Sequence, residues 1–154
     1  MAGSLKRLGL DTNVLIDRGL EKPFAVEFID VFQKRGYSLE VPPTVIMELG
    51  YLKVNGEDRQ KEGADKALQW MRAWGLSPVV LKDVEQSYKT NFITLAQEAG
   101  LLPPKEINDL HILAETAIAG IHGLVTSDTA LLYIDQKGLN LTFEKCRSDD
   151  RDAG

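Results

Sequence analysis

Hydrophobic and polar positions follow two alternating patterns along this chain. Short apolar runs bounded by glycine, proline or charged residues are typical of buried strands. Between these runs, apolar residues return every three or four positions, which is typical of one buried helix face. The runs predict strands at residues 8–10, 38–41, 78–81, 124–127 and 139–143, and the helical spacing predicts helices at residues 24–35, 43–54, 61–74, 83–99, 107–121 and 129–134. This alternation of strands and helices predicts a parallel sheet covered by helices on both faces.

Two of the predicted strands end at an aspartate. Asp11 follows the first strand and precedes a helix that starts near Val14, and Asp128 follows the strand that begins at Leu124. Ligands of open α/β sheets bind at the carboxyl ends of the strands, which favours a functional role for both acids. The structural alternative is that Asp11 or Thr12 only caps the next helix.

Two further acids belong to predicted helices. Glu48 lies at the edge of an apolar stripe, where a charge needs a cation or hydrogen-bond donors unless the side chain leans out to solvent. Asp109 lies in or near the first turn of an alanine-rich helix, where a helix cap is the alternative role and Asn108 competes for it.

Asp11, Glu48, Asp109 and Asp128 can converge at one edge of the sheet. Clustered carboxylates repel one another unless they bind hard divalent cations, and Mg²⁺ and Mn²⁺ prefer such oxygen ligands. A cation of this kind activates water near neutral pH and stabilises the charge of a phosphate. The cluster therefore predicts hydrolysis of a phosphodiester, with neutral polar neighbours that orient ligands or water: Asn13, Thr126 and Ser127.

Composition narrows the class of protein. The 154 residues are 44% hydrophobic and 27% charged, which suits one globular domain, expected at residues 1–147 with a disordered tail at 148–154. The net charge of -5 argues against coating nucleic acid through an overall field, although a local basic patch stays open. The lone cysteine, Cys146, excludes an intrachain disulfide and a cysteine-based metal cluster, and no run has the length of a signal peptide or membrane span. We therefore expect a cytoplasmic protein without membrane partners.

Four stretches together resemble the PIN-domain nucleases, in the order of that family and over about residues 8–143. They are Asp11-Thr12-Asn13-Val14-Leu15, Glu48 in its helix, Asn108-Asp109 in the alanine-rich helix, and Val125-Thr126-Ser127-Asp128. The resemblance implies a parallel five-stranded sheet and Mg²⁺- or Mn²⁺-dependent cleavage of single-stranded or structured RNA. It places Asp11, Glu48, Asp109 and Asp128 on the metal-binding acids of the family. It also implies a homodimer and, as in the VapC-like toxins, an antitoxin that blocks the acidic site.

Other classes fit the sequence less well. A haloacid-dehalogenase-type phosphohydrolase needs a second acid where this chain has Asn13, and a lysine before the last aspartate that the chain lacks. A P-loop is absent from the sequence. A housekeeping RNA-processing nuclease and a catalytically degenerate RNA-binding or assembly module remain alternatives to a toxin. His111 and His122 are expected to be polar helix-edge residues rather than ligands.

Surfaces for RNA and for a second copy can also be proposed from the pattern. Trp70 and Trp74 lie one turn apart with Ala67 and Met71, so this face is either core or an interface, and the helix at residues 24–32 is a second candidate. Basic residues in loops or at helix starts are candidates for RNA contact: Lys53, Arg59, Lys61 and Lys105.

Overall fold

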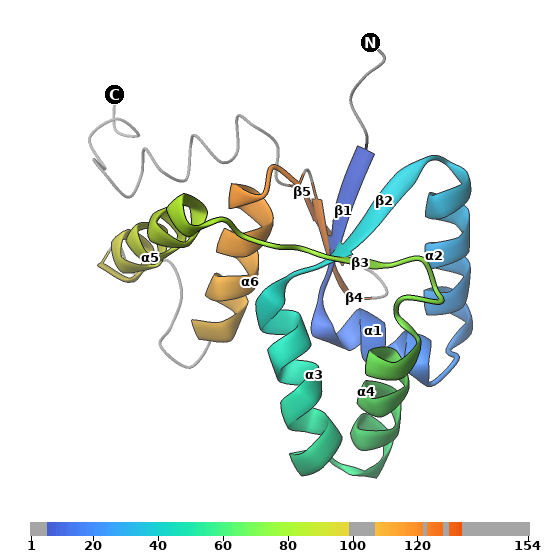
Figure 1. The fold of residues 1–154 in the computed structure, drawn as a ribbon. Coiled ribbons are helices and arrows are strands. Elements are labelled where there is room, and N and C mark those ends of the chain that lie inside the picture. Colours follow the sequence, from blue (N-terminus) through green and yellow to red (C-terminus); the bar gives the residue numbers. More distant parts are fainter. Residues whose placement is uncertain (1–5, 99–106, 122, 128–129, 134–154) are drawn as a thin grey trace.

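The computed structural model describes residues 6–98, 107–121, 123–127 and 130–133, which form an α/β fold (Figure 1). Strands and helices follow the predicted order as far as residue 127, but the third strand is Ser77–Pro78 and the prediction of a strand at residues 78–81 is wrong beyond Pro78. In chain order the elements are β1 (Lys6–Leu10), α1 (Thr12–Gly19), α2 (Pro23–Lys34), β2 (Tyr37–Val41), α3 (Pro43–Asn55), α4 (Asp58–Trp70), β3 (Ser77–Pro78), α5 (Asp83–Glu98), α6 (Ile107–Ile118), β4 (Gly123–Ser127) and β5 (Ala130–Tyr133).

The strands pair in the order β3-β2-β1-β4-β5. β1 is central and parallel to both β2 and β4, and β2 is parallel to β3. β5 instead pairs antiparallel with β4. The parallel part of the described sheet therefore has four strands, and the prediction of an all-parallel five-stranded sheet is wrong because β5 is antiparallel.

The segment that forms β5 was predicted to be part of a helix at residues 129–134, and this prediction is also wrong. Ala130 to Tyr133 form a strand in which Ala130 lies opposite Ser127 of β4. Only two residues separate these partners in the sequence, a length that suits an antiparallel hairpin and not a parallel crossover. A short apolar run has no periodicity that distinguishes the two structures. The predicted strand at residues 139–143 and the tail at 148–154 lie outside the described residues.

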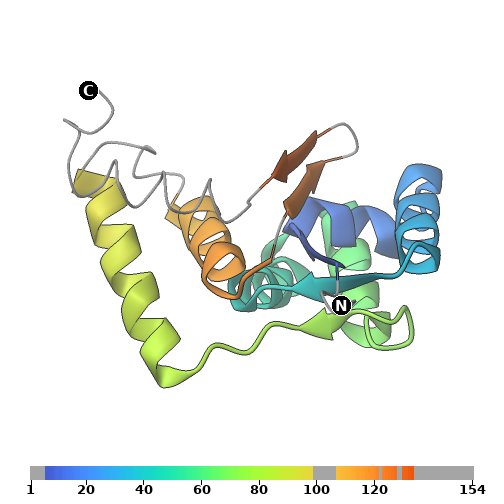
Figure 2. The ribbon, with the colours of Figure 1, turned by 90° about the horizontal axis from the view of Figure 1, so that it is seen from above.

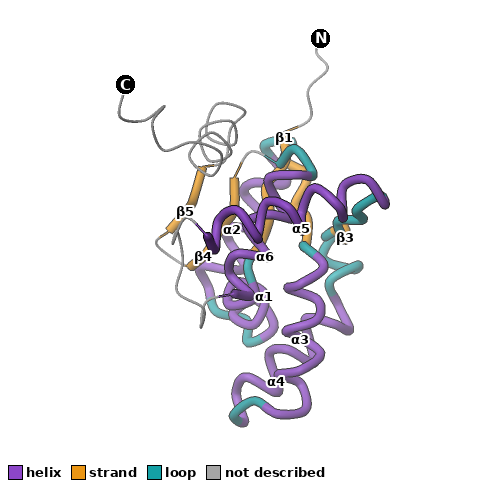
Figure 3. The backbone as a smooth tube through the Cα atoms, turned by 90° about the vertical axis from the view of Figure 1, so that its left-hand side faces the viewer, coloured by secondary structure: helices purple, strands orange, loops and turns teal. Residues whose placement is uncertain are grey.

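Helices lie on both sides of the sheet, as predicted (Figure 2). α6 packs against β4 on one side and carries α5 as an outer layer, whereas α1 and α2 lie on the other side. α3 and α4 pack against each other and contact α6 and α1 respectively. Viewed from the side of α5, the pair α3 and α4 extends below the sheet (Figure 3). No helix in the described part of the chain is long and apolar enough to cross a membrane.

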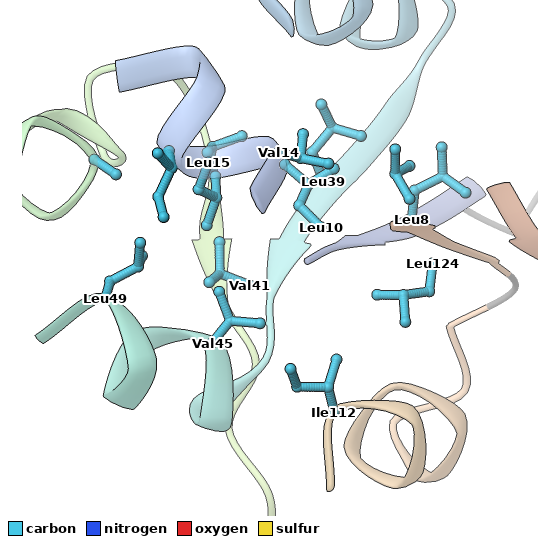
Figure 4. Packing of buried hydrophobic residues seen from close by; sticks show 14 of the residues in the cluster. Leu8, Leu10, Val14, Leu15, Leu39, Val41, Val45, Leu49, Ile112 and Leu124 are labelled. Atoms are coloured by element: carbon cyan, nitrogen blue, oxygen red, sulfur yellow. The ribbon is translucent and has the colours of Figure 1, made fainter. Parts of the chain in front are cut away.

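The hydrophobic core joins the central strands to α1, α3 and α6 (Figure 4). Leu10 at the end of β1 and Leu15 of α1 are fully buried, and so is Val45 in the first turns of α3. Asp11 directly follows Leu10, and Glu48 lies one turn after Val45 on the same helix. The packing fixes the positions from which Asp11 and Glu48 extend.

Both boundaries of α4 differ from the prediction. The polar stretch at residues 55–60 was expected to be a loop, but α4 already begins at Asp58. Glu57 and Gln60 form a capping box, in which the Glu57 backbone N–H donates to Gln60 Oε1 at 3.1 Å. α4 also ends at Trp70 rather than Trp74.

Candidate functional site

Asp11 lies between β1 and α1 at the carboxyl edge of the sheet. Its backbone is extended, and its Oδ1 accepts a hydrogen bond from the Thr12 backbone N–H at 2.7 Å. Its own N–H donates to the carbonyl oxygen of Val125 in β4 at 2.9 Å. The cap role and the sheet-edge position are therefore both found, and neither excludes the other.

Glu48 reaches from α3 to the starts of two other helices. The Thr12 hydroxyl donates to Glu48 Oε1, and the Asn108 side-chain amide donates to Glu48 Oε2 at 3.1 Å. Glu48 is half-buried, and within the described part of the chain it forms no ion pair. The alternative of a glutamate that leans out to solvent is wrong, because both carboxylate oxygens are used inside the fold.

The other two predicted acids are described less completely. The backbone of Asp109 lies in the first turn of α6, directly after Asn108, and its side chain is outside what the structure describes. Asp128 lies outside the described residues. Among the residues that the structure does describe, no three metal-ligating side chains form a group. The four-acid cluster therefore stays a prediction.

The predicted neutral neighbours lie on the elements expected for them. Asn13 is exposed in the first turn of α1, and Thr126 is half-buried in β4, the strand beside β1. Ser127 is the last residue of β4, and the structure describes its backbone only. Their roles as neighbours of a bound ion stay predictions.

His111 is half-buried on α6, which suits the expectation of a helix-edge residue. Burial lowers its pKa below the usual value, and the positive charge of Lys89 acts in the same direction, whereas Glu115 opposes both. His122 lies outside the described residues.

The donors around Glu48 are compatible with a hard divalent cation. Thr12 and Asn108 are neutral, so they orient the carboxylate without cancelling its charge. A carboxylate oxygen that accepts one hydrogen bond keeps a second lone pair for another ligand. Each Glu48 oxygen accepts one such hydrogen bond, from Thr12 or from Asn108, and the carboxylate oxygens of Asp11 and Glu48 are of the type that Mg²⁺ and Mn²⁺ prefer.

The comparisons with known proteins support the fold alone. No family model matches the chain, and no curated protein matches it. A chain of the crystal structure of VapBC2 from Rickettsia felis, bound to a DNA fragment from the promoter, superposes with a TM-score of 0.59. The two are 16% identical, and the match covers 75% of this chain and 83% of that one. The chain therefore has an α/β fold similar to that of a VapBC2 component.

The structure adds residues that the sequence pattern did not single out as ligand-orienting groups. Thr12 and Asn108 belong to the stretches that resemble the PIN-domain nucleases, but the only roles considered for them were helix caps. Each is adjacent to a predicted acid, a signal that could have indicated a supporting role. Glu115 was not considered, although a carboxylate inside an alanine-rich apolar helix needs partners in the fold.

The predicted tryptophan face is not one continuous surface. The Trp74 ring packs partly buried against the core, with the Arg18 guanidinium 4.4 Å from its centre, whereas Trp70 is 52% exposed. On α2, Phe28 and Phe32 stack on each other at 4.3 Å and also pack against the core. Part of the apolar surface proposed for dimerisation is thus already used within one chain.

The basic candidates for RNA contact have different surroundings. Lys53 forms an ion pair with Asp65 at 3.4 Å, which joins α3 to α4. Arg59 and Lys61 are exposed on α4, and Lys105 lies outside the described residues. Lys53 is therefore the least available of the described candidates.

Proposed function

We propose that this chain is a metal-dependent endoribonuclease that hydrolyses RNA phosphodiester bonds and acts as the toxin of a toxin–antitoxin pair. The observation that carries the proposal is the position of Glu48, whose two oxygens accept hydrogen bonds from Asn108 and from Thr12, the residue that follows the strand-end Asp11. The fold shared with a VapBC2 chain supports the same class. The alternatives are a housekeeping RNA-processing nuclease and a degenerate RNA-binding or assembly module.

Asp11 and Glu48, with Asp109 and Asp128, would hold Mg²⁺ or Mn²⁺ at the carboxyl edge of the sheet. When bound, such a cation acidifies water and stabilises the charge that builds up on the phosphate. Thr12 and Asn108 keep the Glu48 carboxylate in one orientation, so little reorganisation is needed on binding. Asp11 is fixed in turn by its cap hydrogen bond to the start of α1.

The partners follow from the same proposal. An antitoxin would bind over the acidic edge and block it, and a homodimer would bury apolar surface that one small domain leaves exposed. A short neighbouring reading frame that encodes a DNA-binding protein would favour the toxin over the housekeeping enzyme. Binding of that protein to this chain, with loss of cleavage, is the direct test.

The experiment that tests the activity compares the parent with Glu48→Gln and Asp17→Asn. Asp17 is an acid of α1 whose carboxylate pairs with Lys22 at 3.1 Å, so its replacement is a control for the loss of one charge. We expect the parent and Asp17→Asn to cleave single-stranded or structured RNA with Mg²⁺ or Mn²⁺. EDTA should stop both, and Glu48→Gln should be inactive under all conditions.

Two results would overturn the proposal. Undiminished cleavage in excess EDTA would remove the metal mechanism. Equal cleavage by Glu48→Gln and the parent would place the reaction at another site of the chain.

A further inference from the structure

The first turn of α3 lacks a cap from its own sequence. The N-cap position is Pro42, which offers no side-chain hydrogen bond, and the first helical residue is Pro43. The acceptor comes instead from α6. Glu115 accepts from the Thr44 backbone N–H at 2.9 Å with one oxygen and from the Thr44 hydroxyl at 2.6 Å with the other. The Glu115 carboxylate thus also stands at the positive end of the α3 dipole.

Glu115 is 1% exposed, so its charge needs compensation inside the fold. Lys89 of α5 supplies it, with its Nζ 3.1 Å from Glu115 Oε2. Among the described residues, no buried side-chain nitrogen or oxygen is left without a hydrogen-bond partner. Glu115 is therefore a fully satisfied buried carboxylate, held in one position by groups from α3 and α5.

Two polar contacts consequently join α3 to α6. Thr44 binds Glu115, and one helical turn later Glu48 binds Asn108. Thr44 and Glu48 are four residues apart and share one face of α3. Asn108 and Glu115 are seven residues apart and share one face of α6, so both contacts lie between the same two helix faces. The contact at the start of α3 is with a residue near the end of α6, and the contact farther along α3 is with a residue at the start of α6. The two helices are thus fixed against sliding and against rotation at the level of Glu48.

From this arrangement we infer that Glu115 is a positioning residue that sets the place of Glu48. This inference rests on the proposed function for its catalytic meaning, because the hydrogen bonds described for Glu115 are to Thr44 and Lys89 and not to Glu48. Without the two charged oxygens of Glu115, the backbone N–H and the hydroxyl of Thr44 cannot both keep their acceptors, and Pro42 offers no substitute. Glu48, in the next turn, then loses the fixed distance at which Thr12 and Asn108 hold it.

The test compares Glu115→Gln and Thr44→Val with Glu40→Gln. Glu40 of β2 is also a buried carboxylate, 7% exposed, but it pairs with Arg7 of β1 at 2.6 Å and forms no described hydrogen bond to Thr44, Glu48 or Asn108. Thr44→Val removes only the hydroxyl and serves if Glu115→Gln folds poorly. Two readouts are measured on the whole chain: amide hydrogen exchange at residues 44–48 without metal, and the rise of the melting temperature with Mn²⁺.

We expect Glu115→Gln and Thr44→Val to exchange these amides at least tenfold faster than the parent, and to bind Mn²⁺ about 10- to 100-fold more weakly. Glu40→Gln should lower the melting temperature while leaving both readouts at parental values. Parental exchange at residues 44–48 in both Glu115→Gln and Thr44→Val would overturn the inference, whatever Mn²⁺ does. If the parent itself shows no response to Mn²⁺, the proposed function fails, and the exchange data still decide whether Glu115 holds α3.

Discussion

Asn108 and Glu48 are 60 residues apart in sequence and are joined by a hydrogen bond of 3.1 Å from the Asn108 amide to Glu48 Oε2. The donor is neutral, so the glutamate keeps its full charge while its orientation is restricted. The contact also ties the start of α6, and with it the backbone of Asp109, to α3. A residue adjacent to a predicted acid thus orients another predicted acid from a different helix.

Asn108→Ala should lower RNA cleavage about 10- to 100-fold, because it removes one of the two groups that orient Glu48. Thr12 still donates to the other oxygen, so the cost in unfolding free energy should be only about 1 kcal/mol. Asn55→Ala is the matched control, since Asn55 also donates one side-chain hydrogen bond, to the Tyr51 carbonyl oxygen on α3. Initial rates at saturating Mn²⁺ measure the effect. Equal rates for the two variants would show that Asn108 does not support Glu48.

Asp11 carries two roles that two substitutions should separate. Asp11→Asn should abolish cleavage, since it removes a ligand charge, yet leave the metal-free protein at least as stable as the parent, because Asn caps helices as well as Asp. Asp11→Ala should be inactive too, and should also lose about 1 kcal/mol of unfolding free energy with the cap. Urea denaturation without metal distinguishes them. A metal-free Asp11→Asn protein that is as unstable as Asp11→Ala would show that the charge itself is structural.

The two tryptophans should respond differently to truncation. Trp74→Ala should lower the unfolding free energy by about 1–3 kcal/mol, because the ring packs against the core and against Arg18. Trp70→Ala should change it by less than about 0.5 kcal/mol, since that side chain is 52% exposed. Sedimentation at micromolar concentration then tests the predicted homodimer on both variants. A dimer that dissociates with Trp70→Ala alone would locate the interface at Trp70, whereas a parent that is monomeric would remove the dimer prediction.

The sequence predicted most of the described elements because apolar periodicity reports which face of each element is buried. β1, β2 and α3 were expected where they occur, and the start of α3 is marked by Pro43. The position of Asp11 followed from the same pattern, since a strand that ends in an acid can be read directly.

The features that were not predicted depend on tertiary contacts, which the apolar periodicity of the sequence does not reveal. Whether residues 130–133 form a strand is decided by their hydrogen bonds to β4, which a short apolar run does not reveal. In the same way, no local pattern shows that Thr12 and Asn108 converge on Glu48, or that Glu115 caps a helix that lies 71 residues earlier. The local sequence thus indicated Asp11 and Glu48, whereas the donors that hold Glu48 are brought to it by tertiary packing.

The close contact between α1 and α4 depends on a glycine of α4. A Cβ built on Gly63 of α4 would lie 2.7 Å from the carbonyl oxygen of Ile16 and 2.7 Å from its Cγ2. Backbone atoms cannot yield as a flexible side chain does, so Gly63→Ala should force the helices apart and cost about 1–3 kcal/mol of unfolding free energy. Gly50 of α3 is the control, because a Cβ there meets nothing within 4 Å. Gly50→Ala should gain up to about 1 kcal/mol from helix propensity. Since both variants share that intrinsic gain, the difference between their denaturation midpoints measures the helix contact alone. Equal midpoints would mean that α1 and α4 do not pack this closely.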